Sequence, residues 1–342
     1  MAKNLLIGIT QKGTIHTDAH PPISIDEMFR RVKESGAYDY MDKTPPEEEV
    51  GDYAKAAEKY DLPILAGGWF YTLGRDEALL EKNLQIAKTL GSKVHNTQIM
   101  AAGADGHAVT DEMVLEAYLR AYDFGMKLGV TPCFEVHVNM WSEDFRRVNE
   151  VAEMVKQRGI PFNMTLDHSH VIFKIDNPEE WDVFAVEDPE ERARCSIRQA
   201  VESGELVLDP FKPNNVCSQW IEANYPRNMH ARAAVPAGPK NKWARHEDGR
   251  MGRGIQYPFI EPQPGQWHSD WDESRLEPWK EVVRQALQHH ATHDESNLHQ
   301  VSTEFIPNPD YGGGAKYSIL ENSIACARWI RQTWQQIQTR AA

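Results

Sequence analysis

Cysteine is scarce in this sequence of 342 residues, and the four that occur form no recognisable pattern. No two of them make a CxxC pair, and four in a chain of this length do not amount to a disulfide scaffold. We therefore expect mostly buried thiols in a reducing, cytoplasmic environment. The four are Cys133, Cys195, Cys217 and Cys326.

Long apolar runs and an excess of positive charge are also missing. No stretch approaches the roughly 18–20 apolar residues that cross a bilayer. The N-terminus has no basic segment followed by an apolar one, so we expect neither a membrane span nor a secretory signal. Lys and Arg number 37 against 51 Asp and Glu, which gives a formal net charge of -14. Such a surface repels phosphate backbones, so the composition argues against nucleic-acid binding.

Short apolar runs alternate with amphipathic helical stretches along most of the chain. Ser24 followed by Glu27 predicts the start of one helix, and Gly36 predicts its end. Strands that alternate with helices in this way form βαβ units and a parallel sheet. The apolar runs predict eight strands, at residues 5–10, 37–42, 62–71, 93–100, 130–138, 160–167, 227–235 and 298–306.

Eight such units, without an early glycine-rich phosphate fingerprint, favour an α/β fold of the (β/α)8 TIM-barrel type over a doubly wound sheet. We expect residues 1–342 to form one domain. The regular pattern breaks at residues 205–273, which are rich in Pro, Gly, Trp and charge. This stretch predicts an extended loop or insertion around strand seven, at the barrel mouth. It could be a lid, a partner surface or an insertion without a role of its own.

Polar residues interrupt the apolar strands near their C-terminal ends, where TIM barrels place their catalytic groups. Glu135, His137 and Asn139 alternate along the fifth strand, so they face the same side. Asp167 ends the sixth strand and Glu304 lies on the eighth. A carboxylate on an apolar strand is costly to bury unless it is paired or bound to a metal ion.

These residues predict a site for one divalent metal ion. Glu135, Asp167 and Glu304 would repel one another in one barrel mouth unless a cation lay between them, and His230 on the seventh strand supplies a fourth ligand. Oxygen and nitrogen donors without thiolate suit Mn²⁺, Mg²⁺ or Co²⁺, and also Zn²⁺. Taken singly, each carboxylate could instead pair with a basic residue or cap a loop. His230 lies in the irregular region, where a hydrogen-bonded loop histidine is a comparable alternative.

The sequence resembles the xylose isomerase-like TIM barrels, a group of sugar isomerases and epimerases that also includes endonuclease IV. The resemblance implies that Glu135, Asp167, His230 and Glu304 are the metal ligands. It also implies that His170, and with it Arg232, binds the substrate. The marks of the resemblance are Phe134-Glu135, Asp167-x-x-His170, His230 followed by Gly265 and Asp270 before a helix, and Glu304.

A narrower resemblance rests on the string Glu135-Val-His137-Val-Asn139-Met-Trp141 and on the overall length of the chain. The string differs from the ketose epimerase pattern, as does the long gap after His230. The string and the length are similar to the α subunit of bacterial C-glycoside deglycosidases. Those enzymes cleave 3-oxo-C-glycosides by β-elimination and work with a small β subunit. This resemblance implies a sugar or glycoside substrate and a small β subunit as partner. We also expect Mn²⁺ as the first choice of ion, and an oligomer.

Two reactions therefore remain open, and in both a base removes the proton next to a sugar carbonyl that a metal ion polarises. In a ketose 3-epimerase or sugar isomerase, Glu135 and Glu304 would exchange the proton at C3. In the lyase, His137 would take the proton at C2 of a 3-oxo sugar, although it could instead orient Glu135. Trp141 could stack on a sugar or aglycone, or belong to the core, and Asn139 would face the substrate.

A nuclease or a catalytically inactive barrel fits the sequence less well. An endonuclease of the endonuclease IV type would need more metal-binding histidines and a basic face, whereas this chain is acidic. The complete set of four ligands argues against an inactive barrel.

Overall fold

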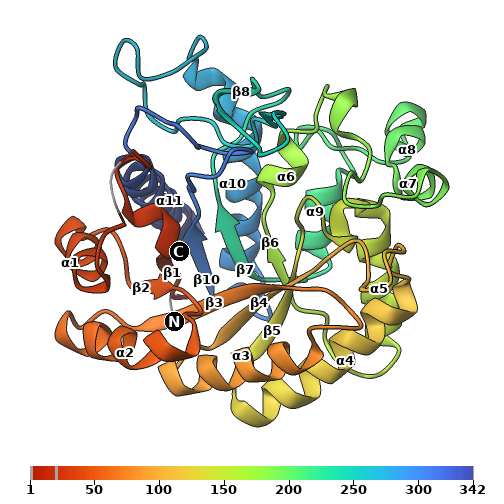
Figure 1. The fold of residues 1–342 in the computed structure, drawn as a ribbon, viewed down its shortest axis with the longest axis horizontal. Coiled ribbons are helices and arrows are strands. Elements are labelled where there is room, and N and C mark those ends of the chain that lie inside the picture. The colour runs from red at the N-terminus through yellow and green to blue at the C-terminus, as the bar shows by residue number, and fades with distance from the viewer. Residues whose placement is uncertain (1–2, 20–21, 342) are drawn as a thin grey trace.

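Eight parallel strands close into a barrel (Figure 1). The structure is a computed structural model that describes residues 3–19 and 22–341. Strand β1 pairs with both β2 and β10, and this double pairing closes the ring. The predicted (β/α)8 barrel is confirmed. Its strands are β1 (Leu6–Thr10), β2 (Tyr40–Asp42), β3 (Ile64–Tyr71), β4 (Val94–Ile99), β5 (Thr131–Glu135), β6 (Met164–Leu166), β7 (Pro226–Ala231) and β10 (Gln300–Thr303).

Helices cover the outside of the barrel. The first begins after Ser24, whose hydroxyl accepts a hydrogen bond from the Glu27 N–H at 3.1 Å, and ends at Gly36 with φ of 63°, as predicted. The α-helices are α1 (Ile25–Ser35), α2 (Val50–Lys59), α3 (Glu77–Leu90), α4 (Asp111–Leu128), α5 (Phe145–Lys156), α6 (Ser169–Ile172), α7 (Pro189–Cys195), α8 (Arg198–Ser203), α9 (Val216–Glu222), α10 (Glu277–Thr292) and α11 (Ile319–Ala341). Short 3-10 helices are η1 (Gln11–Thr14), η2 (Glu47–Glu49), η3 (Trp141–Glu143), η4 (Pro178–Glu180) and η5 (Glu273–Leu276).

The long helices pack on the barrel through apolar faces at helical spacing. In α5 the buried residues include Phe145, Val148, Ala152 and Val155, three or four positions apart. Each such side chain contributes about 1.5–3 kcal/mol when it leaves water. The packing leaves the strand ends as the place where polar groups can gather.

Several strands end earlier than the sequence predicts. Strand β5 ends at Glu135 instead of residue 138, and β7 ends at Ala231 instead of residue 235. Val136, Val138 and Val235 are still buried. Apolar residues therefore continue past the point where strand pairing stops, and the sequence pattern alone does not reveal that point.

Residues 205–273, predicted as one irregular stretch, contain α9 and β7, which belong to the barrel. The part outside the barrel is residues 232–272, and it rises over the C-terminal ends of the strands (Figure 1). It carries the antiparallel hairpin β8 (Asn241–Arg245) and β9 (Met251–Gly252). We call this hairpin and Arg253 the rim hairpin.

A buried ion-pair network fastens the rim hairpin to the barrel. Arg253 lies 3.0 Å from a Glu143 carboxylate oxygen and 2.6 Å from one of Glu180. Lys174 also pairs with Glu143, at 2.8 Å. Burial opposes ionisation of Glu143, but Lys174 and Arg253 lower its pKa to about 2. The network therefore holds its charges and joins three segments that are far apart in the sequence.

All four cysteines are free thiols, and three of them are buried, as predicted. Burial raises the pKa of Cys133 to about 12. Within residues 3–19 and 22–341, no helix combines the length and apolar character that a membrane span requires.

Candidate metal centre

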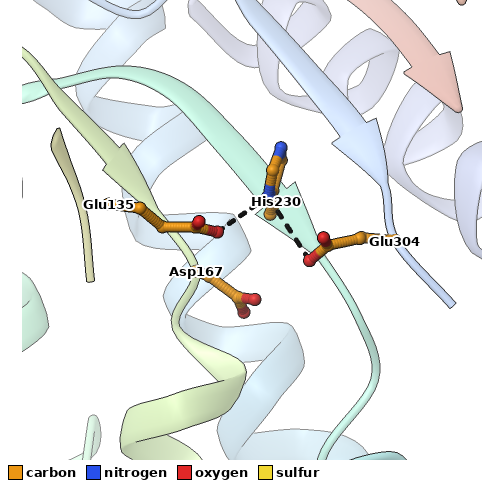
Figure 2. Close-up of side chains that lie close together, drawn as sticks. All are labelled: Glu135, Asp167, His230 and Glu304. Carbon is orange, nitrogen blue, oxygen red and sulfur yellow. Dashed lines mark hydrogen bonds and ion pairs between the residues drawn. The ribbon is translucent and has the colours of Figure 1, made fainter. Parts of the chain in front are cut away.

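Four side chains that the sequence predicts as metal ligands converge at the C-terminal ends of four neighbouring strands (Figure 2). Glu135 is the last residue of β5, Asp167 follows β6, His230 lies in β7 and Glu304 follows β10. One ligand atom from each residue lies within 4.8 Å of those from the other three. The parallel order of these strands brings together residues as much as 169 positions apart in the chain.

His230 stands between carboxylates on both sides of its ring. Its Nδ1 lies 2.8 Å from Glu135 Oε1 and 3.3 Å from Glu304 Oε2 (Figure 2). Its Nε2 lies 3.3 Å from Oδ2 of Asp42, at the end of β2. Burial disfavours the charged ring, but Glu304 and Glu135 raise the pKa of His230 well above its ordinary value.

Hydrogen bonds fix the carboxylate of Glu135. Asn96 Nδ2 donates to Glu135 Oε2 at 2.7 Å, and Gln98 Nε2 donates to the same oxygen. Both donors come from β4, and all three residues are buried. Because the hydrogen bonds from Asn96 and Gln98 fix Oε2, Oε1 is directed toward His230.

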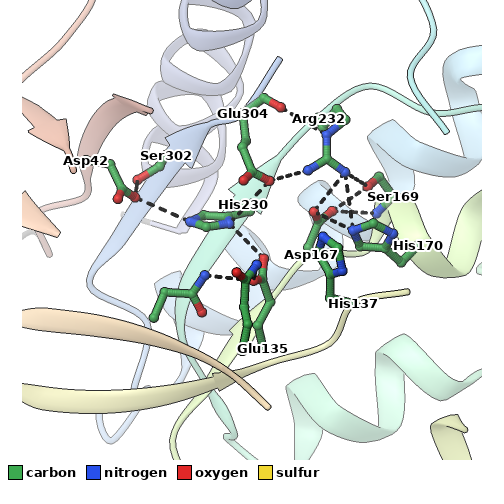
Figure 3. A network of polar contacts seen from close by, with 12 residues as sticks. Asp42, Glu135, His137, Asp167, Ser169, His170, His230, Arg232, Ser302 and Glu304 are labelled. Carbon is green, nitrogen blue, oxygen red and sulfur yellow. Dashed lines mark hydrogen bonds and ion pairs between the residues drawn. The ribbon is translucent and has the colours of Figure 1, made fainter. Parts of the chain in front are cut away.

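Arg232 lies beside Asp167 and Glu304 and forms an ion pair with each of them (Figure 3). Its Nη1 is 3.0 Å from Asp167 Oδ2, and its Nη2 pairs with Glu304. His170 Nε2 is 3.1 Å from the same Asp167 oxygen. Burial opposes ionisation of Asp167, but Arg232 and His170 hold its pKa well below the ordinary range. His170 and Arg232, two of the four predicted substrate-binding residues, are thus fully buried and support the carboxylates.

The charges of this cluster fit a divalent cation. Asp42, Glu135, Asp167 and Glu304 bring four carboxylates together, and Arg232 is the cation that pairs with two of them. Such an excess of negative charge is costly to bury unless a cation compensates it. Three carboxylate donors and one imidazole donor match the preferences of Mn²⁺, Mg²⁺, Co²⁺ or Zn²⁺. A neutral His230 with its proton on Nε2, toward Asp42, would leave Nδ1 free as the ligand.

A cavity of about 700 Å³ opens onto the cluster, and we call it the mouth cavity. Glu304 and His230 lie in its wall, as do the aromatic side chains of Trp69 and Phe70 from β3. These two rings are 40% and 48% exposed, which is high for residues of a barrel strand. The cavity therefore pairs a charged floor with an aromatic side.

His137 and Asn139, both predicted site residues, line the mouth cavity. His137 Nδ1 donates to the Val138 carbonyl at 2.5 Å, so Nε2 carries the lone pair and accepts from the Tyr311 hydroxyl at 3.2 Å. Burial, together with the neighbouring His170, lowers the pKa of His137 to about 4. His137 is therefore a neutral imidazole at pH 7.

Trp141 does not reach the mouth cavity. Only 2% of its surface is exposed, and it belongs to the main hydrophobic core. Asn139 adopts a positive φ of 65°, which turns the chain at this point. The ring of Trp141 packs beneath the Arg147 guanidinium instead, at 5.9 Å. The predicted stacking of Trp141 on a substrate therefore has no geometric basis in this structure.

Comparisons with known proteins agree on the fold. No protein-family model and no curated protein matches the chain. Among solved structures, an L-ribulose 3-epimerase matches with a TM-score of 0.56 and 11% identity over 99% of this chain and 97% of the other. D-allulose 3-epimerase from Methylomonas sp., in complex with D-allulose, gives 0.51 and 12% over 98% and 97%. The 3-keto-D-glucoside 4-epimerase from E. coli gives 0.50 and 12% over 96% and 100%.

The chain has the barrel fold of the sugar epimerases. This fold likeness carries nothing specific to C-glycoside deglycosidases, so the narrower resemblance gains no support from it. Two residues of the site were not predicted from the sequence. Asp42 ends a three-residue strand, and Tyr311 lies in a loop without regular structure. Neither stands in a motif, so only the fold reveals them.

Proposed function

We propose that this protein is a divalent-metal-dependent enzyme that removes the proton next to the carbonyl of a sugar, as a ketose 3-epimerase or sugar isomerase does. The observation that carries the proposal is the convergence of Glu135, Asp167, His230 and Glu304 at the open end of the barrel. Two of the solved structures that share the fold are 3-epimerases of D-allulose and L-ribulose, and they support the same reaction class. Mn²⁺ is the proposed ion, with Mg²⁺, Co²⁺ and Zn²⁺ as alternatives.

A divalent ion held by this quartet would supply Lewis-acid polarisation of the substrate carbonyl. Glu135 and Glu304 approach His230 Nδ1 from two sides, at 2.8 and 3.3 Å. A sugar bound over this point would have one carboxylate on each face. One carboxylate oxygen would take the proton at the carbon beside the carbonyl, and the other would return a proton to the opposite face. Arg232 keeps Glu304 in place through its ion pair.

A second candidate is a lyase for 3-oxo-glycosides of the C-glycoside deglycosidase type. The mouth cavity favours it, because about 700 Å³ lies within the roughly 300–1,000 Å³ of pockets that hold drug-sized ligands. Trp69 and Phe70 could contact an aromatic aglycone, and His137 would remove the proton at C2 with Nε2, which would have to exchange its hydrogen bond from Tyr311 for the substrate. This candidate includes a small β subunit as partner and an oligomeric assembly. His137→Ala is then expected to retain the metal and lose aglycone release, and unchanged release would exclude His137 as the base.

A reaction screen separates the two candidates. The Mn²⁺-loaded protein is incubated with free ketohexoses in one arm and with 3-oxo-glucosides carrying C- and O-linked aromatic aglycones in the other. Products are separated by chromatography and identified by mass spectrometry. The proposal predicts an epimer or isomer in the first arm that disappears in Glu135→Gln and persists in Glu153→Gln, an exposed control on the outer face of α5.

The other outcomes are equally informative. Aglycone release in the second arm, without any change in the free sugars, would replace the epimerase with the lyase. The absence of product in both arms, with the metal bound, would contradict proton abstraction from a sugar by this chain alone.

A further inference from the structure

Two lysines lie at the mouth cavity without an ion-pair partner among the residues that the structure describes. Lys12, in η1, follows β1, and Lys43 follows β2 directly. Strands β1 and β2 pair in parallel with Thr10 opposite Asp42, so the two lysines follow neighbouring strand ends. Both line the mouth cavity. Lys12 Nζ donates to Asn308 Oδ1 at 3.3 Å, which is a neutral acceptor.

The two lysines differ in exposure, since Lys12 is exposed at the rim of the cavity and Lys43 is half-buried. Burial lowers the pKa of Lys12, and nearby Arg232 lowers it further, while Glu304 acts in the opposite direction. Burial also lowers the pKa of Lys43; Glu49 opposes this shift, the like charge of Lys12 adds to it, and Asp42 opposes it as well. Within the described chain neither lysine forms an ion pair, so the carboxylates that influence them do so without direct contact. An anion placed between them would relieve both effects.

Two threonine hydroxyl groups of residues that line the mouth cavity also lack hydrogen-bond partners within the described chain. Thr10 and Thr44 line the mouth cavity beside the lysines. The Oγ1 atoms of both are buried and form no hydrogen bond to any part of the chain that the structure describes. Thr44 is only 3% exposed. Buried hydroxyls are normally satisfied by the protein or by a ligand, so these two are free to donate to a bound group.

We propose that Lys12, Lys43, Thr10 and Thr44 form an anion subsite that binds a terminal phosphate or carboxylate of the sugar substrate. Ammonium and hydroxyl donors together match the acceptor oxygens of such groups. Lys43 directly follows Asp42, which contacts His230, so the subsite adjoins the metal centre. A sugar with its carbonyl at the metal centre would extend its far end toward this subsite. The inference deepens the proposed function, since it assigns an acidic sugar as the substrate class.

The test measures binding rather than turnover. The Mn²⁺-loaded full-length protein is titrated calorimetrically with three ligands: D-fructose, its 6-phosphate, and the keto-uronic acid in which C6 is a carboxylate. We expect one of the two anionic ligands to bind at least tenfold more tightly than D-fructose. A preference for the phosphate ester identifies a phosphate group, and a preference for the uronic acid identifies a carboxylate.

Matched variants assign the preference to the subsite. Lys12→Met and Lys43→Met should each remove most of it and leave the affinity for D-fructose within twofold of the original. Lys93→Met changes the charge equally but lies before β4, at the opposite end of the barrel, and should retain the preference. Lys12→Arg and Lys43→Arg keep the positive charge and should retain the preference for the anionic ligand. This comparison separates the effect of losing the charge from the effect of disturbing the fold.

Equal affinities for all three ligands would overturn the subsite, and so would a preference that survives in the Lys12→Met/Lys43→Met double variant. Failure of the proposed function looks different. In that case the lysine-dependent preference for an anion persists, but no sugar is converted in the presence of the bound metal.

Discussion

At the scale of single residues, the most informative contact is the one between Asp42 and His230. A metal-binding histidine commonly donates its second ring N–H to a carboxylate, which fixes both the tautomer and the orientation of the ring. Asp42 Oδ2 lies 3.3 Å from His230 Nε2 and accepts a hydrogen bond from Ser302 Oγ at 2.6 Å (Figure 3). Asp42 is thus held in position to orient His230.

Replacing Asp42 by Asn should weaken metal binding by roughly 10–100-fold. The amide has lost the negative charge that favours an N–H at Nε2, so His230 would no longer be held with Nδ1 free. Competition with a fluorescent chelator measures the dissociation constant for Mn²⁺. Asp52→Asn, on the exposed face of α2, is the control and should bind the ion as the original protein does. Unchanged affinity in Asp42→Asn would show that Asp42 does not orient His230.

Only some residues of the site could be predicted from the sequence. Glu135, Asp167 and Glu304 could be predicted because a carboxylate that follows an apolar strand is conspicuous. Asp42 ends a strand that the sequence also predicts, at residues 37–42, but it stands in no motif that would distinguish it from other polar residues at strand ends. His170 and Arg232 were expected to touch the substrate, but the sequence carries no information on their depth, and both are completely buried. The motifs therefore predicted the converging carboxylates better than the surroundings of the groups next to them.

At the scale of elements, a buried network ties the rim hairpin to Glu143 and Glu180, and Asn241 and His246 tie it to residues 309–313. Arg253 is 10% exposed in its side chain and bridges Glu143 and Glu180. Removing one partner of a buried ion pair leaves an uncompensated charge, and this typically costs about 3–5 kcal/mol. Lys174 still pairs with Glu143 when Arg253 is removed, so the loss should fall mainly on the hairpin.

Arg253→Met should therefore lower the free energy of unfolding by about 3 kcal/mol and expose the amides of β8 and β9. Urea denaturation measures the first effect, and hydrogen exchange read by mass spectrometry measures the second. Arg250→Met is a matched control on the same hairpin, because its pair with Asp248 is largely exposed and is worth at most about 1 kcal/mol. Equal protection of the hairpin in both variants would mean that the network does not hold it.

Helix ends and strand order were predictable at the element scale, whereas the rim was not. Ser24 and Gly36 mark the ends of α1 because capping is a local interaction. Strand β7 was harder to recognise, since Arg227, Asn228 and His230 interrupt its apolar pattern. The rim hairpin is held by long-range ion pairs to Glu143 and Glu180, and no local pattern encodes such pairs. The extent of the region outside the barrel therefore became clear only from the fold.

At the scale of the whole molecule, buried histidines tie stability to pH. His95 has no exposed surface and accepts a hydrogen bond from the Tyr71 hydroxyl at 2.7 Å. Burial lowers the pKa of His95 to about 4 in the folded protein. The unfolded chain, with an ordinary pKa near 6.5, binds more protons between these values. Stability should therefore be full above pH 6.5 and fall as the pH drops toward 4.

His95→Gln should reduce the decrease in the free energy of unfolding between pH 7 and pH 4 by roughly 3 kcal/mol, since each pKa unit is worth about 1.4 kcal/mol. The measurement is urea denaturation at a series of pH values, compared as slopes. His107→Gln serves as the control because His107 is largely exposed, and its slope should match that of the original protein. An unchanged slope in His95→Gln would mean that His95 does not resist protonation in the folded state.

The metal content of the intact protein tests the central claim most directly. After loading with Mn²⁺ and removal of free ion, elemental analysis should find one ion per chain in the original protein. It should find essentially none in Glu135→Gln and Asp167→Asn, each with an unaltered circular dichroism spectrum. Full metal content in both variants would show that these residues do not form the metal site, and the account of the barrel mouth as a metal-dependent active site would then be wrong.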